Sequence, residues 1–244
     1  MKYEQNIPFY ITKFKDYPWK KYESAHYIFH VKENSLAEKE IEIIKTRQES
    51  AYTKITQTLE LKEPDQKIKY YFYLSRDKKA ELMGDDWYGQ SIYKEFEVHA
   101  VYNEQDKVIG EHEDTHLLSL QLGMSISFFQ EGLAEAMVGK SMFGNEHNVI
   151  IKERLGKDLV IDISSLMSQQ GWLDTPDEEA EFYYSIAGSF IKYLLDNMGL
   201  QKFKELYRKM ERGKSAQENI KIFEEITGCS LKALEDKWIE SLSN

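Results

Sequence analysis

The stretch GEHEDTHLLSL, residues 110–120, decides how the rest of the chain is interpreted. It places two histidines, His112 and His116, four residues apart, with Glu113 directly after the first. In an α-helix four residues advance by about 400°, so the two imidazoles lie about 40° apart on one face. Glu113 points about 100° away from His112. The pattern therefore predicts a helix on which two histidines can reach one metal ion.

This H-E-x-x-H spacing is typical of a zinc site that has its own general base. Zinc binds imidazole and carboxylate ligands, and a hydrolytic site keeps one coordination position for water. We therefore expect one Zn²⁺ per chain on His112 and His116, with Glu113 placed to take a proton from the zinc-bound water. The alternative is a solvent-exposed acidic helix with two surface histidines, because Glu111 and Asp114 are charged where such helices are usually apolar.

A complete hydrolytic zinc site needs a third protein ligand. An extended motif of the metzincin type would have Gly at position 119 and His at position 122, but this chain has Ser119 and Leu122, which excludes that class. Gly123 is expected to end the motif helix. The third ligand should therefore come from the next helix.

That second helix is predicted over SFFQEGLAEAM, residues 127–137, with Ser127 and Gln130 as a capping box. Glu131 falls one turn into it, fifteen residues after the second histidine, so a helix–turn–helix can bring its carboxylate to the same ion. Glu135 lies one turn further on the same face. Metal-binding histidines usually donate their other N–H to a carboxylate or carbonyl, and Glu135 is the candidate for that role; the alternative is an exposed helix acid.

The composition limits the classes of partner. The net charge is −10 and no Lys/Arg cluster is visible, so neither nucleic acid nor an anionic membrane is the expected partner. No run approaches 18 apolar residues, so no membrane span is predicted. The single cysteine, Cys229, excludes an internal disulfide framework. The sequence leaves the oligomeric state open.

The pattern along the chain predicts an α+β fold. Strands are expected at residues 24–32, 67–75 and 93–103, with a long amphipathic helix over residues 35–61. After about residue 105 the pattern is helical almost throughout. We therefore predict a mixed α/β lobe with a small sheet at residues 1–104 and a helical lobe at residues 105–244. The segment 97–103 of the third strand is expected to edge the cleft, where it could pair with an extended substrate backbone. The zinc-binding helix pair is expected at the seam, and both lobes together form one catalytic unit.

The other histidines carry no metal prediction. His26 and His30 are also four residues apart, but on a strand this spacing separates them by about 13 Å. His99 is expected to be a partly buried structural residue, with substrate contact as the alternative, and His147 carries no signal. The first residues, MKYEQNIPFYITKFKDYPWKK, lack the apolar segment of a signal peptide. They predict a cytoplasmic protein, and the alternative is a secreted or cell-envelope protein whose signal has been removed.

Beyond the metal motif, the order HExxH, FFQEGLAEAM and FYYSIAGSF resembles the gluzincin zinc metallopeptidases, specifically the peptidase MA-like families of bacteria. The similarity extends to the closing helix ITGCSLKALEDKWIESL and spans about residues 24–242. Carried over to this chain, the resemblance implies His112, His116 and Glu131 as the zinc ligands and Glu113 as the base.

The resemblance also implies an oxyanion donor, which in related gluzincins is a tyrosine at about the place of Tyr184; Tyr183 is the neighbouring alternative. The chain departs from the aminopeptidases of the wider clan, because no Gly-x-Met-Glu-Asn strand precedes the motif. Binding of a substrate's free amine is therefore not implied, and the choice between endopeptidase and exopeptidase stays open.

The function predicted from the sequence is a zinc-dependent metallopeptidase, in which Glu113 assists the attack of a zinc-bound water on a peptide bond. The alternative from another class is a zinc-containing binding module, an inactive peptidase-like protein that recognises a protein or peptide partner. A helical interaction protein without a metal is the third possibility. The substrate and the cleavage specificity are not encoded in any motif that we recognise.

Overall fold

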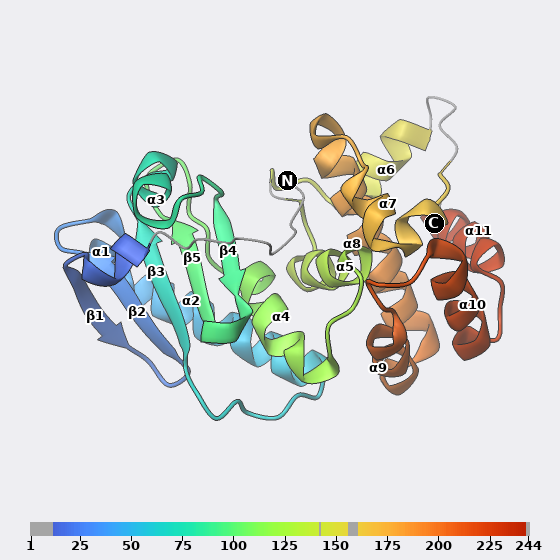
Figure 1. The fold of residues 1–244 in the computed structure, drawn as a ribbon, viewed down its shortest axis with the longest axis horizontal. Coiled ribbons are helices and arrows are strands. Elements are labelled where there is room, and N and C mark those ends of the chain that lie inside the picture. Colours follow the sequence, from blue (N-terminus) through green and yellow to red (C-terminus); the bar gives the residue numbers. More distant parts are fainter. Residues whose placement is uncertain (1–11, 142, 156–160, 243–244) are drawn as a thin grey trace. The chain divides into compact units, whose positions relative to one another are not determined.

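The computed structural model describes residues 12–141, 143–155 and 161–242; the residues before Thr12, on which the signal-peptide prediction mainly rests, lie outside them. The described chain has the predicted α+β fold, with a mixed five-stranded sheet in its N-terminal part and a helical C-terminal part (Figure 1). It divides into two compact units, one that ends at Leu120 and one that begins at Gln121.

The N-terminal unit alternates strands with helices. Its strands are β1 (Trp19–Glu23), β2 (Tyr27–Lys32), β3 (Ile68–Tyr73), β4 (Gly89–Ile92) and β5 (Glu97–Val101). Its α-helices are α1 (Leu36–Lys39), α2 (Ile41–Thr58), α3 (Arg76–Met83) and α4 (Glu111–Leu118). Its 3₁₀ turns are η1 (Thr12–Asp16) and η2 (Tyr93–Glu95), and a third, η3 (Ser119–Leu122), spans the unit boundary.

The strand order in the sheet is β1-β2-β3-β5-β4. The three central strands are parallel, whereas β1 and β4 each run antiparallel to their neighbour. Parallel neighbours need a crossover, and the helices α1 and α2 supply the one between β2 and β3. Helices therefore cover the sheet, and its side chains alternate between two buried faces.

One face of the sheet packs against α2 and α4. Figure 1 shows α2 along this face. It carries aromatic side chains such as Tyr27, Phe29 and Tyr70, which are fully buried. The opposite face carries a row of stacked rings, His30 on Tyr71 and Tyr71 on His99, which lie beside one another across β2, β3 and β5. The prediction that His99 is structural rather than exposed to substrate agrees with its complete burial.

The prediction that the strand at residues 97–103 could pair with an extended substrate backbone is wrong. Strand β5 pairs with β3 on one side and with β4 on the other, and each of its residues is buried. The edge next to it is β4, which the sequence did not predict because its four residues are too few to show an alternating pattern. Strand β1 was missed as well, because its WKKYE sequence carries charged residues at exposed positions.

The C-terminal unit contains α5 (Ser127–Val138), α6 (His147–Leu155), α7 (Gln169–Leu173), α8 (Ala180–Met198), α9 (Leu200–Lys209), α10 (Ala216–Thr227) and α11 (Leu231–Leu242), with short 3₁₀ turns at Ser165–Met167 and Asp177–Glu179. Helices α5 and α8 lie side by side (Figure 1). Phe190 of α8 stacks on Phe128 of α5 and meets Trp238 of α11 edge to face. These rings form the core of the unit.

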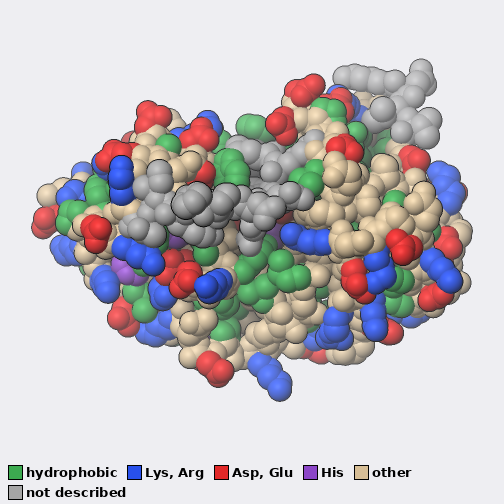
Figure 2. All heavy atoms as spheres, in the orientation of Figure 1, with side chains coloured by type: hydrophobic (Ala, Val, Ile, Leu, Met, Phe, Trp, Pro, Cys, Tyr) green, Lys and Arg blue, Asp and Glu red, His purple; other side chains and the backbone are tan. Residues whose placement is uncertain are grey.

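The division between the units falls sixteen residues after the boundary at 104/105 that the sequence suggested, since α4 packs against α2, β4 and β5. Among the described residues, no helix is both long enough and apolar enough to cross a membrane. On the face shown in Figure 2, acidic and basic side chains are interspersed, and no large patch of one sign is visible.

Candidate metal centre

Helix α4 begins where the chain turns at Gly110. This residue has φ 108°, a conformation that side-chain-bearing residues rarely adopt, and its N–H donates to Gln48 Oε1 at 2.5 Å. The first turn of the helix then carries Glu111, Glu113 and Asp114. Negative charge is favourable there because the first N–H groups of a helix carry partial positive charge. The acidic start of the motif therefore suits a helix that begins at this point.

Asp114 anchors α4 to the interior of the N-terminal unit. Its carboxylate is completely buried and accepts hydrogen bonds from Tyr27 Oη at 2.5 Å, Tyr70 Oη at 2.7 Å and Gln48 Nε2 at 3.0 Å. Burial raises the pKa of Asp114 to about 7, against the hydrogen bonds of the two tyrosines, which lower it. The three donors come from β2, β3 and α2, so one carboxylate fixes the helix against three elements.

Glu111 makes a second polar anchor. Arg47 and Lys54 of α2 both contact its carboxylate, Lys54 at 3.3 Å. Burial alone would raise the pKa of Glu111, but the hydrogen bond and the charge of Arg47, with that of Lys54, lower it overall. Glu111 and Asp114 are thus buried and paired. The alternative of a solvent-exposed acidic helix is wrong.

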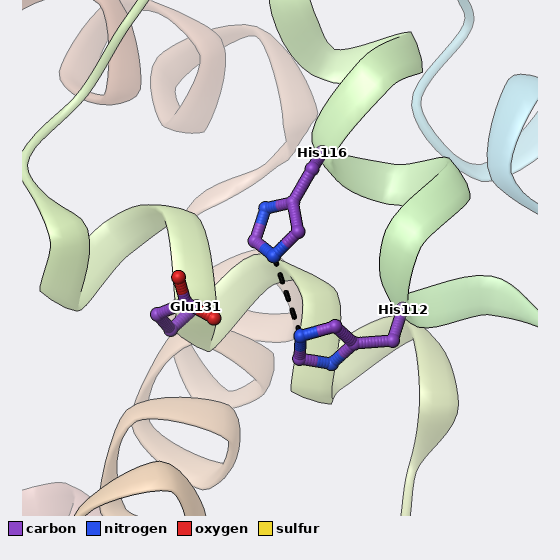
Figure 3. Close-up of side chains that lie close together, drawn as sticks. All are labelled: His112, His116 and Glu131. Atoms are coloured by element: carbon purple, nitrogen blue, oxygen red, sulfur yellow. Dashed lines mark hydrogen bonds between the residues drawn. The ribbon is translucent and has the colours of Figure 1, made fainter. Parts of the chain in front are cut away.

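The two histidines of α4 point to one place. His112 Nε2 and His116 Nε2 lie 3.3 Å apart, as the dashed line in Figure 3 shows, and the ring planes are inclined at 84°. Two zinc–nitrogen bonds of about 2.05 Å at a tetrahedral angle would separate the nitrogens by about 3.3 Å. The pair therefore already has the spacing that one zinc ion requires.

Glu131 lies on α5, where every residue from Ser127 to Met137 is buried. One ligand atom each from His112, His116 and Glu131 lies within 4.8 Å of the others, and no other such group of three occurs among the described residues (Figure 3). Next to the glutamate, Gly132 permits a close approach of α8: a Cβ here would stand 2.7 Å from Ala187 O. The donor set, two imidazoles and a carboxylate, fits Zn²⁺.

The predicted capping box at the start of α5 is wrong. The helix has Ile126 as its N-cap, and no side chain caps it. Ser127 is the first helical residue, and it pairs with Gln169: its N–H donates to Gln169 Oε1 at 3.2 Å, and its Oγ accepts from Gln169 Nε2 at 3.0 Å. A long-range side chain thus takes the place of the local cap.

Glu113, the predicted base, contacts strand β4. Ser91 Oγ lies 2.6 Å from Glu113 Oε2 and 3.0 Å from the Glu113 carbonyl oxygen. The glutamate side chain is partly buried. Sequence analysis did not single out Ser91, because no strand was predicted at its position.

Glu135, the predicted partner of a metal-binding histidine, lies beside His147. Its Oε2 is 3.3 Å from His147 Nε2, whose ring also contacts Ser185 Oγ through Nδ1 at 3.2 Å. Glu135 and His147 are both buried, so the alternative of an exposed helix acid is wrong. The sequence carried no signal for His147, because its partners come from α5 and α8. The bond from Glu135 to a zinc ligand stays a prediction.

Tyr184, the predicted oxyanion donor, lies on α8, and its ring meets Trp172 of α7 edge to face at 5.2 Å. Tyr183, the neighbouring alternative, packs against Phe182. Both tyrosines are partly buried. These ring contacts favour neither tyrosine as the oxyanion donor.

No protein-family model matches the chain, and no curated protein matches it significantly. The resemblance to the gluzincins therefore rests on the sequence motifs.

Proposed function

We propose that this chain is a zinc-dependent metallopeptidase of the gluzincin type, with His112, His116 and Glu131 as ligands of one zinc ion. The observation that carries the proposal is the 3.3 Å between the two Nε2 atoms, with a Glu131 oxygen within 4.8 Å. Three protein ligands of this kind leave a fourth tetrahedral position for water or substrate, as hydrolytic zinc sites require.

In this proposal a bound zinc ion supplies Lewis acidity, which polarises a substrate carbonyl and acidifies water. Glu113 takes a proton from the attacking water and gives it to the leaving amine. Tyr184, by analogy with the gluzincins, donates a hydrogen bond to the developing oxyanion. The substrate is a peptide or protein, since the reaction hydrolyses a peptide bond.

The alternative is a zinc-containing binding module that recognises a partner without cutting it. Such a module needs the ligands but has no use for Glu113. The hydrogen bond that fixes the Glu113 carboxylate on β4 supports the peptidase, because a base must be held near the atom from which it takes a proton.

The test is cleavage of a mixed peptide library by the zinc-loaded protein, read by mass spectrometry. Glu113→Gln should keep its zinc and lose at least about 100-fold in turnover, because general acid–base catalysis contributes that much or more. Glu153→Gln, an exposed change on α6, serves as the control and should leave turnover unchanged. Turnover by Glu113→Gln at the parental rate would contradict the mechanism. A zinc-loaded parent that cleaves no peptide would favour the binding module.

A further inference from the structure

Strand β4 lies directly beneath the predicted base. Gly89 and Ser91 are two residues apart, so they present the same face of the strand. Their register is fixed by antiparallel pairing with β5, Gly89 opposite Ala100 and Ser91 opposite Val98. Helix α4 packs against β4, and Glu113 meets both positions.

Ser91 binds one oxygen of the Glu113 carboxylate. The 2.6 Å between Ser91 Oγ and Glu113 Oε2 is typical of a hydroxyl that donates to a charged acceptor. Ser91 is buried, so solvent competes little for this hydrogen bond. A second Glu113 oxygen, its backbone carbonyl, lies 3.0 Å from the same hydroxyl. The hydroxyl has a single proton to donate, and the shorter distance assigns it to the carboxylate oxygen.

Gly89 leaves space for the other carboxylate oxygen. A Cβ at position 89 would collide with Glu113 Oε1, and it would stand 3.0 Å from Val108 Cγ1 and 3.1 Å from Glu113 Cδ. Any side chain there would push the carboxylate from its place. The absence of a Cβ at Gly89 and the hydroxyl of Ser91 thus define one position for Glu113.

We propose that Ser91 and Gly89 are positioning residues for the general base: Ser91 orients the Glu113 carboxylate through a hydrogen bond, and Gly89 makes room for it. The inference rests on the proposed function and adds a role for β4. A displacement of about 1 Å in a reacting group can lower a rate about 100-fold, so a base on a flexible side chain needs such support.

The experiment compares Ser91→Ala, Ser91→Thr and Gly89→Ala with the parent, all zinc-loaded. Ser91→Ala should lower kcat about 10- to 100-fold and leave KM within about twofold, because the serine acts through the base. Ser91→Thr keeps the hydroxyl and should recover most of the rate. Gly89→Ala should lower kcat about 100-fold. The zinc content should be unchanged in all three variants.

Ser24→Ala is the matched control. Ser24 Oγ also donates to a glutamate, Glu49 Oε1, at 2.6 Å in the same unit, and it lies outside the proposed catalytic machinery. This variant should keep the parental kcat. In a Glu113→Gln background, Ser91→Ala should cause no further loss, because the group that it positions has already been replaced.

A fall in kcat for Ser91→Ala no larger than that for Ser24→Ala would overturn the inference. So would an equal fall in kcat from Ser91→Ala in the Glu113→Gln background and in the parent. If the zinc-loaded parent cleaves no peptide, the proposed function fails, and crystal structures of the parent and Ser91→Ala then decide the inference separately. The Glu113 carboxylate should leave its place over Gly89 when the hydroxyl is removed; an unmoved carboxylate would contradict the positioning role.

Discussion

Helices α4 and α5 both carry predicted zinc ligands, yet different forces hold each of them within its own unit. Helix α4 is fixed by polar contacts: Asp114 accepts three buried hydrogen bonds, and Glu111 pairs with Arg47. Helix α5 is fixed by close packing, since Gly132 lets α8 approach its backbone. Polar contacts depend on the chemistry of a side chain, whereas close packing depends on its volume. The two helices should therefore fail under different substitutions.

The largest effect is expected from added volume on α5. Gly132→Ala would place a Cβ 2.7 Å from Ala187 O and 2.5 Å from Ile191 Cγ1, and the backbone oxygen cannot turn aside as a flexible side chain would. We expect a net loss of about 3 kcal/mol in the free energy of unfolding, measured by urea denaturation. Gly213→Ala, where nothing lies within 4 Å, should change it by less than about 0.5 kcal/mol. Equal effects of the two changes would contradict close packing on α5.

The next prediction concerns a buried polar side chain on the sheet face opposite α4. His30 is buried there, with Nδ1 3.2 Å from Tyr70 O, and burial lowers the pKa of His30 to about 4. The unfolded chain, with a pKa near 6.5, then binds more protons than the folded one as the pH falls. The free energy of unfolding therefore keeps its full value, as far as His30 is concerned, above pH 6.5. It should fall by about 2–3 kcal/mol by pH 4.5 because of His30.

Urea denaturation of the parent and His30→Gln at pH 7.5 and 4.5 measures this contribution. The parent should lose more stability than the variant between the two pH values. A parallel loss in both proteins would mean that His30 does not carry the acid sensitivity.

A change of chemistry at constant shape should destabilise α4. Asp114→Asn presents an amide to donors from Tyr27, Tyr70 and Gln48, so at least one buried donor loses its acceptor. We expect a loss of about 2 kcal/mol in the free energy of unfolding. Calorimetry or urea denaturation would detect it. A loss below about 0.5 kcal/mol would show that hydrogen bonds do not anchor this helix.

The smallest effect is expected at the other acidic residue of α4. Glu111→Gln weakens the contacts with Arg47 and Lys54, whose side chains are about half exposed, so solvent screens these contacts. The loss should stay below about 1 kcal/mol and shrink in 0.5 M salt, because salt screens exposed charges. A loss larger than that of Asp114→Asn would reverse the ranking of the two anchors.

The sequence predicted those parts of the molecule that depend on local spacing. The strands near residues 27–32, 68–73 and 97–101 follow from alternating apolar residues, and His112, His116 and Glu131 follow from helical periodicity and a short connection. The parts that depend on distant pairing were not predictable. Asp114 looked out of place in its motif because its donors Tyr27 and Tyr70 lie 87 and 44 residues away.

Two further residues show the same limit. Ser91 contacts Glu113 across 22 residues, and its strand is too short to be recognised from a pattern. His147 meets Glu135 and Ser185 from two other helices. In each case the contact joins two elements whose pairing is set by the packing of the whole unit, and no local motif encodes it.

The central claim is that His112, His116 and Glu131 bind one zinc ion. Elemental mass spectrometry tests it most directly, on protein prepared without a histidine tag or chelator, with His116→Ala and Glu131→Ala measured beside the parent. We expect about one zinc per chain in the parent and a large loss in both variants, because each removes one of three protein ligands. A parent without zinc after zinc has been supplied, or variants that bind as much zinc as the parent, would contradict the claim.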